Sequence, residues 1–118
     1  MLDASVSPPL GTFLVAWLDG EAVGCGGLRP APTGDLGVAE IKRMYVAPSV
    51  RSEGVGRCIV EALEEQARAL GVSRVVLETG TRQDAAIALY EKMGFARIPA
   101  FGEYAESPVA ICMEKRLA

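Results

Sequence analysis

Residues 44–71 read MYVAPSVRSEGVGRCIVEALEEQARALG and decide how the rest of the chain is organised. Val38–Val46 has the pattern of a strand that Pro48 ends, and a turn with two glycines follows. From Gly54 the apolar residues recur at steps of three and four, which predicts a helix with one apolar face. Gly71 supplies the stop. The predicted apolar face consists of Val55, Ile59, Leu63, Ala67 and Leu70.

The turn before this helix has the residues of an anion site. A strand, a glycine turn and a helix start point free backbone amides at one place, where a phosphate group can bind. Gly54 and Gly56 let a pyrophosphate approach the backbone, and Arg51 and Arg57 add positive charge. A Rossmann turn would have a third glycine where Ile59 stands, and a P-loop would have Gly-Lys-Ser/Thr, which is absent. The turn therefore fits neither template.

Strands are predicted on both sides of the helix. Arg74–Thr79 is apolar and β-branched, so Val38–Thr79 forms a strand, a helix and a strand, which implies parallel pairing. Upstream, Asp19-Gly20 is a strong hairpin signal between two apolar segments, Phe13–Leu18 and Glu21–Leu28. In the second of these strands, a bulge or a close backbone approach is predicted by Gly24, Gly26 and Gly27.

Arg29–Gly37 is a predicted loop, and downstream of residue 80 a second helix and two further strands are expected. Asp84 is placed to cap the helix, which ends at Gly94. Its core-facing residues are Ile87, Tyr90 and Met93, and the last strands are Phe95–Ile98 and Val109–Met113. We expect one domain over residues 13–118, after an irregular lead-in at residues 1–12.

Composition excludes several classes of protein. Hydrophobic residues make up 50% of the 118 residues and charged residues 23%, which is typical of a globular chain. A net charge of -3 and scattered basic residues argue against nucleic-acid binding. Without histidine, Ser-His and Cys-His hydrolase mechanisms lose their base. The chain has neither a membrane-length apolar run nor the pattern of a signal peptide, so we expect a soluble, cytoplasmic protein.

The three cysteines do not have the spacing of a metal or disulfide framework. Cys25, Cys58 and Cys112 are far apart, odd in number and without a CxxC pair. Cys58 lies among apolar residues of the predicted helix and Cys112 in an apolar strand, so both are expected to be small buried hydrophobes. We predict no metal.

Three motifs together resemble the GNAT superfamily of N-acetyltransferases. Arg51-Ser52-Glu53-Gly54-Val55-Gly56 matches its signature of Arg or Gln, two residues, Gly, one residue, and Gly or Ala. The match extends to Met44–Pro48 before the turn and to Ala88–Phe95 in the second helix. The resemblance implies an α/β fold with a mixed central sheet and flanking helices. It also implies acetyl-CoA as cosubstrate, its pantetheine in a gap where the strands around the main helix splay apart.

The resemblance also implies roles for particular residues. Pantetheine would bond strand-fashion to Met44, Tyr45 and Val46. Tyr90 matches the family tyrosine that donates a proton to the departing thiolate, although a core aromatic is the alternative. Many relatives have an asparagine before the second helix, and here Gln83 stands near that place. The expected cofactor-binding residues are Met44, Tyr45, Val46, Arg51, Ser52, Glu53, Gly54, Val55, Gly56, Arg57 and Gln83.

Glu40 is the candidate general base. It lies eleven residues before Arg51 in Ala39-Glu40-Ile41, a triplet that resembles the one carrying the base in the histone-acetyltransferase branch. A strand carboxylate beside a cleft can accept an ammonium proton when desolvation raises its pKa. An ion pair with the nearby basic residues, Lys42 and Arg43, is the alternative. Lower-ranked candidates are Glu78 and Tyr104.

The expected function is transfer of an acetyl group to a primary amine of a small molecule or peptide, directly in a ternary complex. Relatives usually begin with a strand and two helices that form one wall of the acceptor site, and only about a dozen residues precede Phe13. We therefore expect the fold to lack those elements, and Phe13–Leu18 to lie at or near a sheet edge that favours a homodimer. A non-catalytic acyl-CoA-binding module and a purely structural domain are the rival interpretations.

Overall fold

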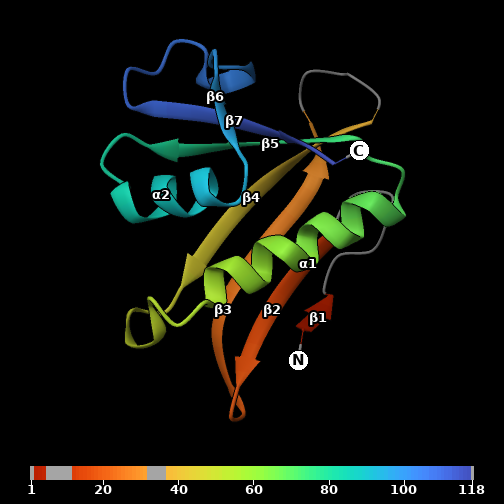
Figure 1. The fold of residues 1–118 in the computed structure, drawn as a ribbon, viewed down its shortest axis with the longest axis vertical. Helices are drawn as coiled ribbons and strands as arrows, with labels where there is room; N and C mark the ends of the chain where they lie inside the picture. The colour runs from red at the N-terminus through yellow and green to blue at the C-terminus, as the bar shows by residue number, and fades with distance from the viewer. Residues whose placement is uncertain (1, 5–11, 32–36, 118) are drawn as a thin grey trace.

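The computed structural model describes residues 2–4, 12–31 and 37–117, which form one twisted sheet and two α-helices (Figure 1). Short 3₁₀ turns, η1 (Pro48–Val50) and η2 (Gly102–Tyr104), precede α1 and β7. In chain order the main elements are β1 (Leu2–Ala4), β2 (Thr12–Leu18), β3 (Glu21–Pro30), β4 (Val38–Val46), α1 (Val55–Ala69), β5 (Arg74–Gly80), α2 (Asp84–Lys92), β6 (Ala96–Ile98) and β7 (Ala110–Arg116).

The sheet is mixed, as expected. Its order within the described residues is β1-β2-β3-β4-β5-β7-β6, and only β4 and β5 pair in parallel. The helix α1 makes the crossover between these two strands, which confirms the predicted strand, helix and strand. At the β2–β3 hairpin, Asp19 and Gly20 both have positive φ, at 50° and 84°, as a two-residue turn of the primed type requires.

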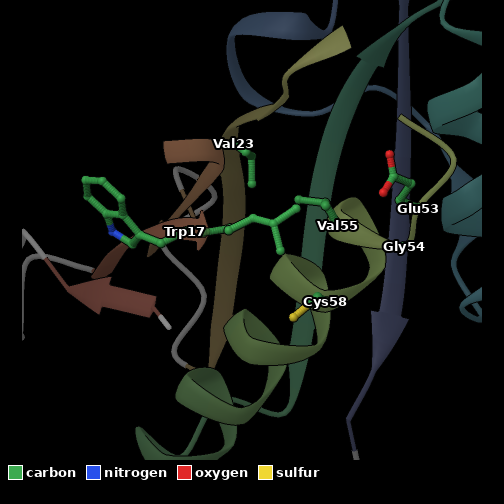
Figure 2. Close-up of a pocket in the computed structure, with 8 residues that line it drawn as sticks. Trp17, Val23, Glu53, Gly54, Val55 and Cys58 are labelled. Carbon is green, nitrogen blue, oxygen red and sulfur yellow. The ribbon is translucent and has the colours of Figure 1, made fainter. Parts of the chain in front are cut away.

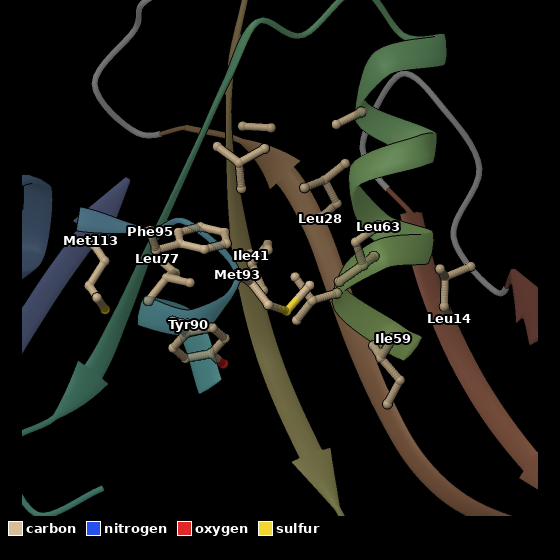
Figure 3. Packing of buried hydrophobic residues seen from close by; sticks show 14 of the residues in the cluster. Leu14, Leu28, Ile41, Ile59, Leu63, Leu77, Tyr90, Met93, Phe95 and Met113 are labelled. Carbon is tan, nitrogen blue, oxygen red and sulfur yellow. The ribbon is translucent and has the colours of Figure 1, made fainter. Parts of the chain in front are cut away.

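Both helices cover the same face of the sheet, and the main core lies between them and the strands (Figure 3). The inner face of α1 contributes Ile59 and Leu63, which are fully buried. From α2 the predicted core residues, Ile87, Tyr90 and Met93, are all buried. A smaller cluster covers part of the opposite face and consists of Ala31, Val38 and Val76, with Ile98 and Phe101 packed against them.

The glycines of β3 allow α1 to pack closely on the sheet. A Cβ at Gly26 would lie 2.8 Å from Cγ2 of Ile59, and one at Gly24 would lie 2.9 Å from Cδ1 of the same residue. The ladder between β2 and β3 also shifts register between Ala16 and Trp17, where β3 has one residue more than β2. Both parts of the prediction for this strand, the bulge and the close approach, are therefore confirmed.

The structure differs from two predictions, one for the N-terminal lead-in and one for the end of β3. Leu2–Ala4 pairs with β2, so the lead-in is not wholly irregular, and β2 lies near the sheet edge, as predicted, with β1 outside it. The unpaired groups of β2 thus find a partner within the chain. Arg29 and Pro30 continue β3 rather than beginning a loop, because they pair with Glu40 and Ala39. Residues 5–11 and 32–36 lie outside the described part of the chain.

Three helix details also differ from the predictions. Gln83, not Asp84, is the N-cap of α2, and no side chain caps it. Cys58, which was predicted to be buried, is exposed, because it lies about 100° around the helix from the buried residue Ile59. Cys112 is buried, as predicted. Leu70 is 48% exposed because α1 ends at Ala69, one residue before it. Neither helix of the described chain is long and apolar enough to cross a membrane.

The approach of α1 to β3 predicts a cost for any side chain at Gly24. A methyl group there would lie 2.8 Å from the Tyr45 carbonyl oxygen, a backbone atom that cannot easily move. We expect Gly24→Ala to lower the free energy of unfolding by about 1–3 kcal/mol, as overpacking does, measured by chemical denaturation. Gly80→Ala is the control, because its nearest neighbour would be 3.5 Å away. An equal loss in both variants would contradict the steric explanation.

Candidate active site

The central feature of the site is the early end of the parallel pairing between β4 and β5. Only four residues of each strand pair, Val38–Ile41 with Arg74–Leu77. Beyond this point β4 continues to Val46, while Glu78–Gly80 of β5 pair with β7 on the other side. The strands therefore diverge, as the GNAT resemblance implied. They leave a cavity of about 960 Å³ between β4, β5 and the N-terminal ends of both helices.

A bulge in β4 shapes one wall of this cavity. Lys42 pairs with Gly27 and Tyr45 with Cys25, so two β4 residues oppose the single residue Gly26. One of the two, Arg43, has a φ of 59°, which is uncommon for a residue with a side chain. A bulge bends its strand and increases the twist. Among the described residues, β4 has no strand partner on its β5 side beyond Ile41, so that edge is available to a ligand.

The start of α1 forms the second wall. Gly54 is the N-cap with a φ of 84°, and no side chain caps the helix, so its first amides face the cavity mouth without an intrahelical acceptor. Arg51 donates from Nε to the Val46 carbonyl at 3.2 Å, which ties the turn to the end of β4. A Cβ at Gly56 would lie 3.1 Å from Cδ2 of Leu89. Gly56 thus also permits the approach of α2.

Most predicted cofactor-binding residues come together around this cavity. Its lining includes Met44, Tyr45, Val46, Arg51, Ser52, Gly54, Val55, Gly56, Arg57 and Gln83. Glu53 is separate from them. It lines a smaller groove that Trp17 and Cys58 also line, and Figure 2 shows Glu53 at the opposite side of that groove from Trp17. Ser52, the residue before Glu53, has a φ of 69°, which is uncommon for a residue with a side chain.

Tyr90 belongs both to the core and to the cavity. Its ring packs edge-on against Phe95, with centroids 5.7 Å apart, and the residue is 5% exposed. It also lines the cavity, on the side opposite the β4 edge. Burial raises the pKa of the Tyr90 phenol to about 12. The phenol is therefore protonated at neutral pH and can donate a hydrogen bond into the cavity.

Glu40 has a different environment from the one expected of a base in a cleft. Its side chain is fully buried, and its Oε1 accepts two hydrogen bonds from Arg29, at 3.0 Å and 2.8 Å. Its Oε2 accepts a hydrogen bond from the Tyr104 hydroxyl at 3.1 Å. Glu40 is not among the cavity-lining residues, whereas Glu78 is. Glu78 is the first β5 residue beyond the parallel pairing.

The cavity carries more positive charge than the turn alone suggested. Three cationic residues were not assigned to the site from the sequence: Lys42, Arg43 and Arg82. Lys42 and Arg43 were seen only as possible partners of Glu40, and no local motif marks Arg82. With Arg51 and Arg57 there are five cations against two acidic lining residues, Glu78 and Asp84, in a chain of net charge -3. Such a cavity favours an anionic ligand.

No group of three or more Cys, Asp or Glu residues in the described part of the chain could hold a metal ion.

Comparisons with known proteins agree with this geometry. Residues 2–95 match the Acetyltransferase (GNAT) family. The chain is 46% identical to an IAA acetyltransferase of Azospirillum brasilense, over 89% of this chain and 67% of the relative. It is 37% identical to the uncharacterised N-acetyltransferase YjgM of Escherichia coli K12, over 78% of this chain and 55% of that protein.

A solved structure also matches. It is a protein from Klebsiella pneumoniae assigned as an acyl-CoA N-acyltransferase, with a TM-score of 0.85 and 37% identity. The match covers 96% of this chain and 77% of the other. The diverging strands, the glycine turn and these similarities lead to one conclusion: the chain belongs to the GNAT family of acetyltransferases.

Proposed function

We propose that the chain transfers an acetyl group from acetyl-CoA to a primary amine of a small molecule or peptide, directly in a ternary complex. The observation that carries this proposal is the cavity that combines an unpaired strand edge, a helix N-terminus and the buried Tyr90. The names of the relatives, which are acetyltransferases, support it. The chain spans about two thirds and about half of their lengths, so the activity of a whole relative is part of the proposal.

The cavity suits the pyrophosphate and the pantetheine of acetyl-CoA. The first amides of α1 and the guanidinium groups of Arg51 and Arg57 suit a pyrophosphate. The open edge of β4 at Met44–Val46 suits the amides of pantetheine, which can bond to it as an added strand would. Gln83, at the start of α2, offers an amide on the opposite side. Acetyl-CoA supplies the activated acyl group, and the protein residues orient it.

Tyr90 is proposed to donate a hydrogen bond to the thioester sulfur as negative charge develops there. Its high pKa ensures that the proton is present, but a thiol has an ordinary pKa of about 8.5. Complete transfer of the proton from the phenol is therefore uphill unless the charges of the bound state lower its pKa. Stabilisation by a hydrogen bond in a dry site requires no complete transfer.

For the base, the geometry favours Glu78 over Glu40. Glu78 lines the cavity, so an acceptor amine can reach it directly or through one water. Glu40 is fully buried, and both of its oxygens already accept hydrogen bonds. The ion-pair interpretation of Glu40 thus gains support, and we propose Glu78 as the group that takes the proton. Cytoplasmic location and homodimer formation stay predictions.

Binding of acetyl-CoA should not need metal and should depend on the backbone at Gly54. Isothermal titration should give the same affinity with and without EDTA. Gly54→Val should weaken binding at least about tenfold, since hydrogen bonds to a charged group contribute roughly 1.5–3 kcal/mol. Gly71→Val is the control, because both glycines have positive φ and a Cβ at either would meet no atom within 4 Å. Equal affinity in the two variants would contradict the assignment of the pyrophosphate site.

Tyr90→Phe should lower kcat about 100-fold, the low end of the effect of a positioned proton donor. The ring and its contact with Phe95 remain, so the melting temperature and the affinity for acetyl-CoA should change little. Turnover is measured by release of the CoA thiol, with spermidine, kanamycin A, glycine methyl ester and the peptide Ala-Ala-Ala as acceptors. Unchanged kcat, where chemistry limits the rate, would leave Tyr90 as a core aromatic. Cofactor binding without turnover of any amine would favour the binding-module interpretation.

The protonation state of Tyr90 provides a control for this variant. Its pKa of about 12 lies above the unfolded value of 10.0. The stability that Tyr90 gains from staying protonated is thus present below pH 10 and is lost as the pH rises toward 12. Absorbance at 295 nm should show a titrating component near pH 12 that Tyr90→Phe lacks. If the component that Tyr90→Phe lacks titrated near pH 10 instead, the Tyr90 phenol would not be buried.

The two carboxylates should differ in their effects on turnover. Wild-type turnover should rise with pH as the acceptor amine loses its proton, and Glu78→Gln should lower kcat more than Glu40→Gln. The reason is that only Glu78 lines the cavity. Initial rates at saturating acetyl-CoA and acceptor measure the difference. The reverse order would restore Glu40 as the base.

A further inference from the structure

Residues of opposite charge occupy matching positions on β4 and β5 where the parallel pairing ends and the strands separate (Figure 1). Ile41 and Leu77 form the last parallel pair and belong to the core on the helix face. Because side chains alternate along a strand, Lys42 and Glu78, the next residues, begin on the other face. Both line the cavity, as does Arg43. These three residues define what we call the closed end of the cavity.

The β4 side of the closed end carries two cations, Lys42 and Arg43. Lys42 Nζ donates a hydrogen bond to the Tyr104 hydroxyl at 2.9 Å, which holds the ammonium group in place. Burial raises the pKa of the Tyr104 phenol, the hydrogen bond from Lys42 lowers it, and the charge and hydrogen bond of Glu40 raise it. The net direction is upward, so the phenol is neutral at neutral pH. It therefore does not cancel the charge of Lys42.

The two carboxylates near these cations differ in their access to the cavity. Glu40 does not line it, and its Oε1 accepts hydrogen bonds from Arg29 at 3.0 Å and 2.8 Å. Glu78 lines it from the β5 side. The other acidic lining residue belongs to α2. A ligand at the closed end therefore meets the two cations on one side and the carboxylate of Glu78 on the other.

The phosphate groups of acetyl-CoA do not account for the cations at the closed end. The phosphate-binding turn begins after Val46, four residues beyond Lys42 along β4. At about 3.3 Å per residue the separation is roughly 13 Å, which exceeds the roughly 8–10 Å over which salt screens exposed charges. Arg51 and Arg57 belong to the turn and to the start of α1, at that other end. Lys42 and Arg43 therefore favour a second anionic group, near the reacting end of the cofactor.

We propose that the closed end binds an acceptor that carries both an amine and a carboxylate, one to a few carbon atoms apart, as in an amino acid. This inference rests on the proposed function and names its substrate class. The carboxylate binds Lys42 and Arg43, and the amine lies toward Glu78. Paired strands are about 4.8 Å apart, and the gap only begins to widen at Lys42, so one small molecule can reach both sides.

This orientation suits the proposed reaction. The neutral amine nitrogen bonds to the acetyl carbon while the bond from that carbon to sulfur breaks, and the electron pair of that bond leaves with the sulfur. The proton that the nitrogen releases passes to Glu78, and Tyr90 stabilises the thiolate. The carboxylate of the acceptor takes no part in the chemistry and fixes the position of the amine. A polycationic acceptor would instead bring like charge toward Lys42 and Arg43, which disfavours it.

The experiment compares amino acids with their own amides as acceptors in the full chain. The pairs are glycine, β-alanine, L-leucine and L-phenylalanine, each with the amide of its carboxyl group. In the best pair, kcat/KM should be at least about tenfold higher for the acid, because charged hydrogen bonds are the strong ones. The amide has the larger fraction of neutral amine, so without a carboxylate site it would be the better acceptor. Spermidine and kanamycin A should be poorer than the best acid.

The ratio of kcat/KM between acid and amide tests the two cations. Lys42→Met keeps an unbranched side chain, and Arg43→Asn uses a residue that tolerates a positive φ, here 59°. Each variant should lower the ratio at least about fivefold, since it removes a charged partner of the carboxylate. General damage to the fold would lower both values and leave their ratio unchanged. Lys92→Met is the matched control, because Lys92 is exposed at the end of α2 and does not line the cavity.

Calorimetric titration provides a readout that does not depend on turnover. Each acid and each amide is titrated into the chain saturated with free CoA. The best acid should bind at least about tenfold more tightly than its amide, and Lys42→Met should remove this difference. Equal kcat/KM for acid and amide in the wild-type chain, or an unchanged ratio in both variants, would overturn the inference.

Absence of turnover with every amine would contradict the proposed function, and the titration would then decide the carboxylate site by itself. A preference for the acid that Lys42→Met removes would uphold the site. Equal binding of acid and amide would overturn it.

Discussion

The rest of the structure depends on the length of the parallel pairing between β4 and β5. Two strands that paired along their whole length would leave no room between them and no free backbone groups on their facing edges. Here the parallel pairing ends after four residues, while β5 pairs with β7 on its other edge along its whole length. The facing edge of β4 is left free at Met44–Val46. One backbone arrangement thus creates both the cavity and the hydrogen-bonding edge along it.

The bulge at Arg43 lies two residues beyond Ile41, the last β4 residue that pairs with β5. A residue with a side chain at φ 59° carries a strain of the order of 1 kcal/mol or more, which the surrounding structure must offset. Packing on both sides of the bulge does so. Gly26 faces the two bulged residues, and the close approach of α1 at this glycine seats Ile59 and Leu63 against β3. The small residues of β3 and the bulge of β4 therefore work as one unit.

The two faces of the sheet serve different purposes at the same strand positions. On the helix face, Ala39 and Ile41 belong to the main core. Glu40 and Lys42, which alternate with these residues along β4, lie on the other face. They belong to a charged hydrogen-bond network that includes Arg29 and Tyr104. Burying a carboxylate requires hydrogen bonds to both oxygens, and the network supplies them. The alternation along β4 thus separates the apolar core on one face from a hydrogen-bonded charged network on the other.

The sequence by itself determined the hairpin at Asp19-Gly20, the bounds of β4, the crossover through α1 and the glycine turn before that helix, because local periodicity and glycine placement encode these features. It did not determine the pairing of Leu2–Ala4 with β2 or the exposure of Cys58, which depend on partners distant in the chain and on the angle around a helix. Nor could it place Glu40, whose neighbours, Arg29 and Tyr104, lie 11 and 64 residues away. A carboxylate's role is set by its solvation and its partners, and those exist only after the strands and the β6–β7 connection have packed.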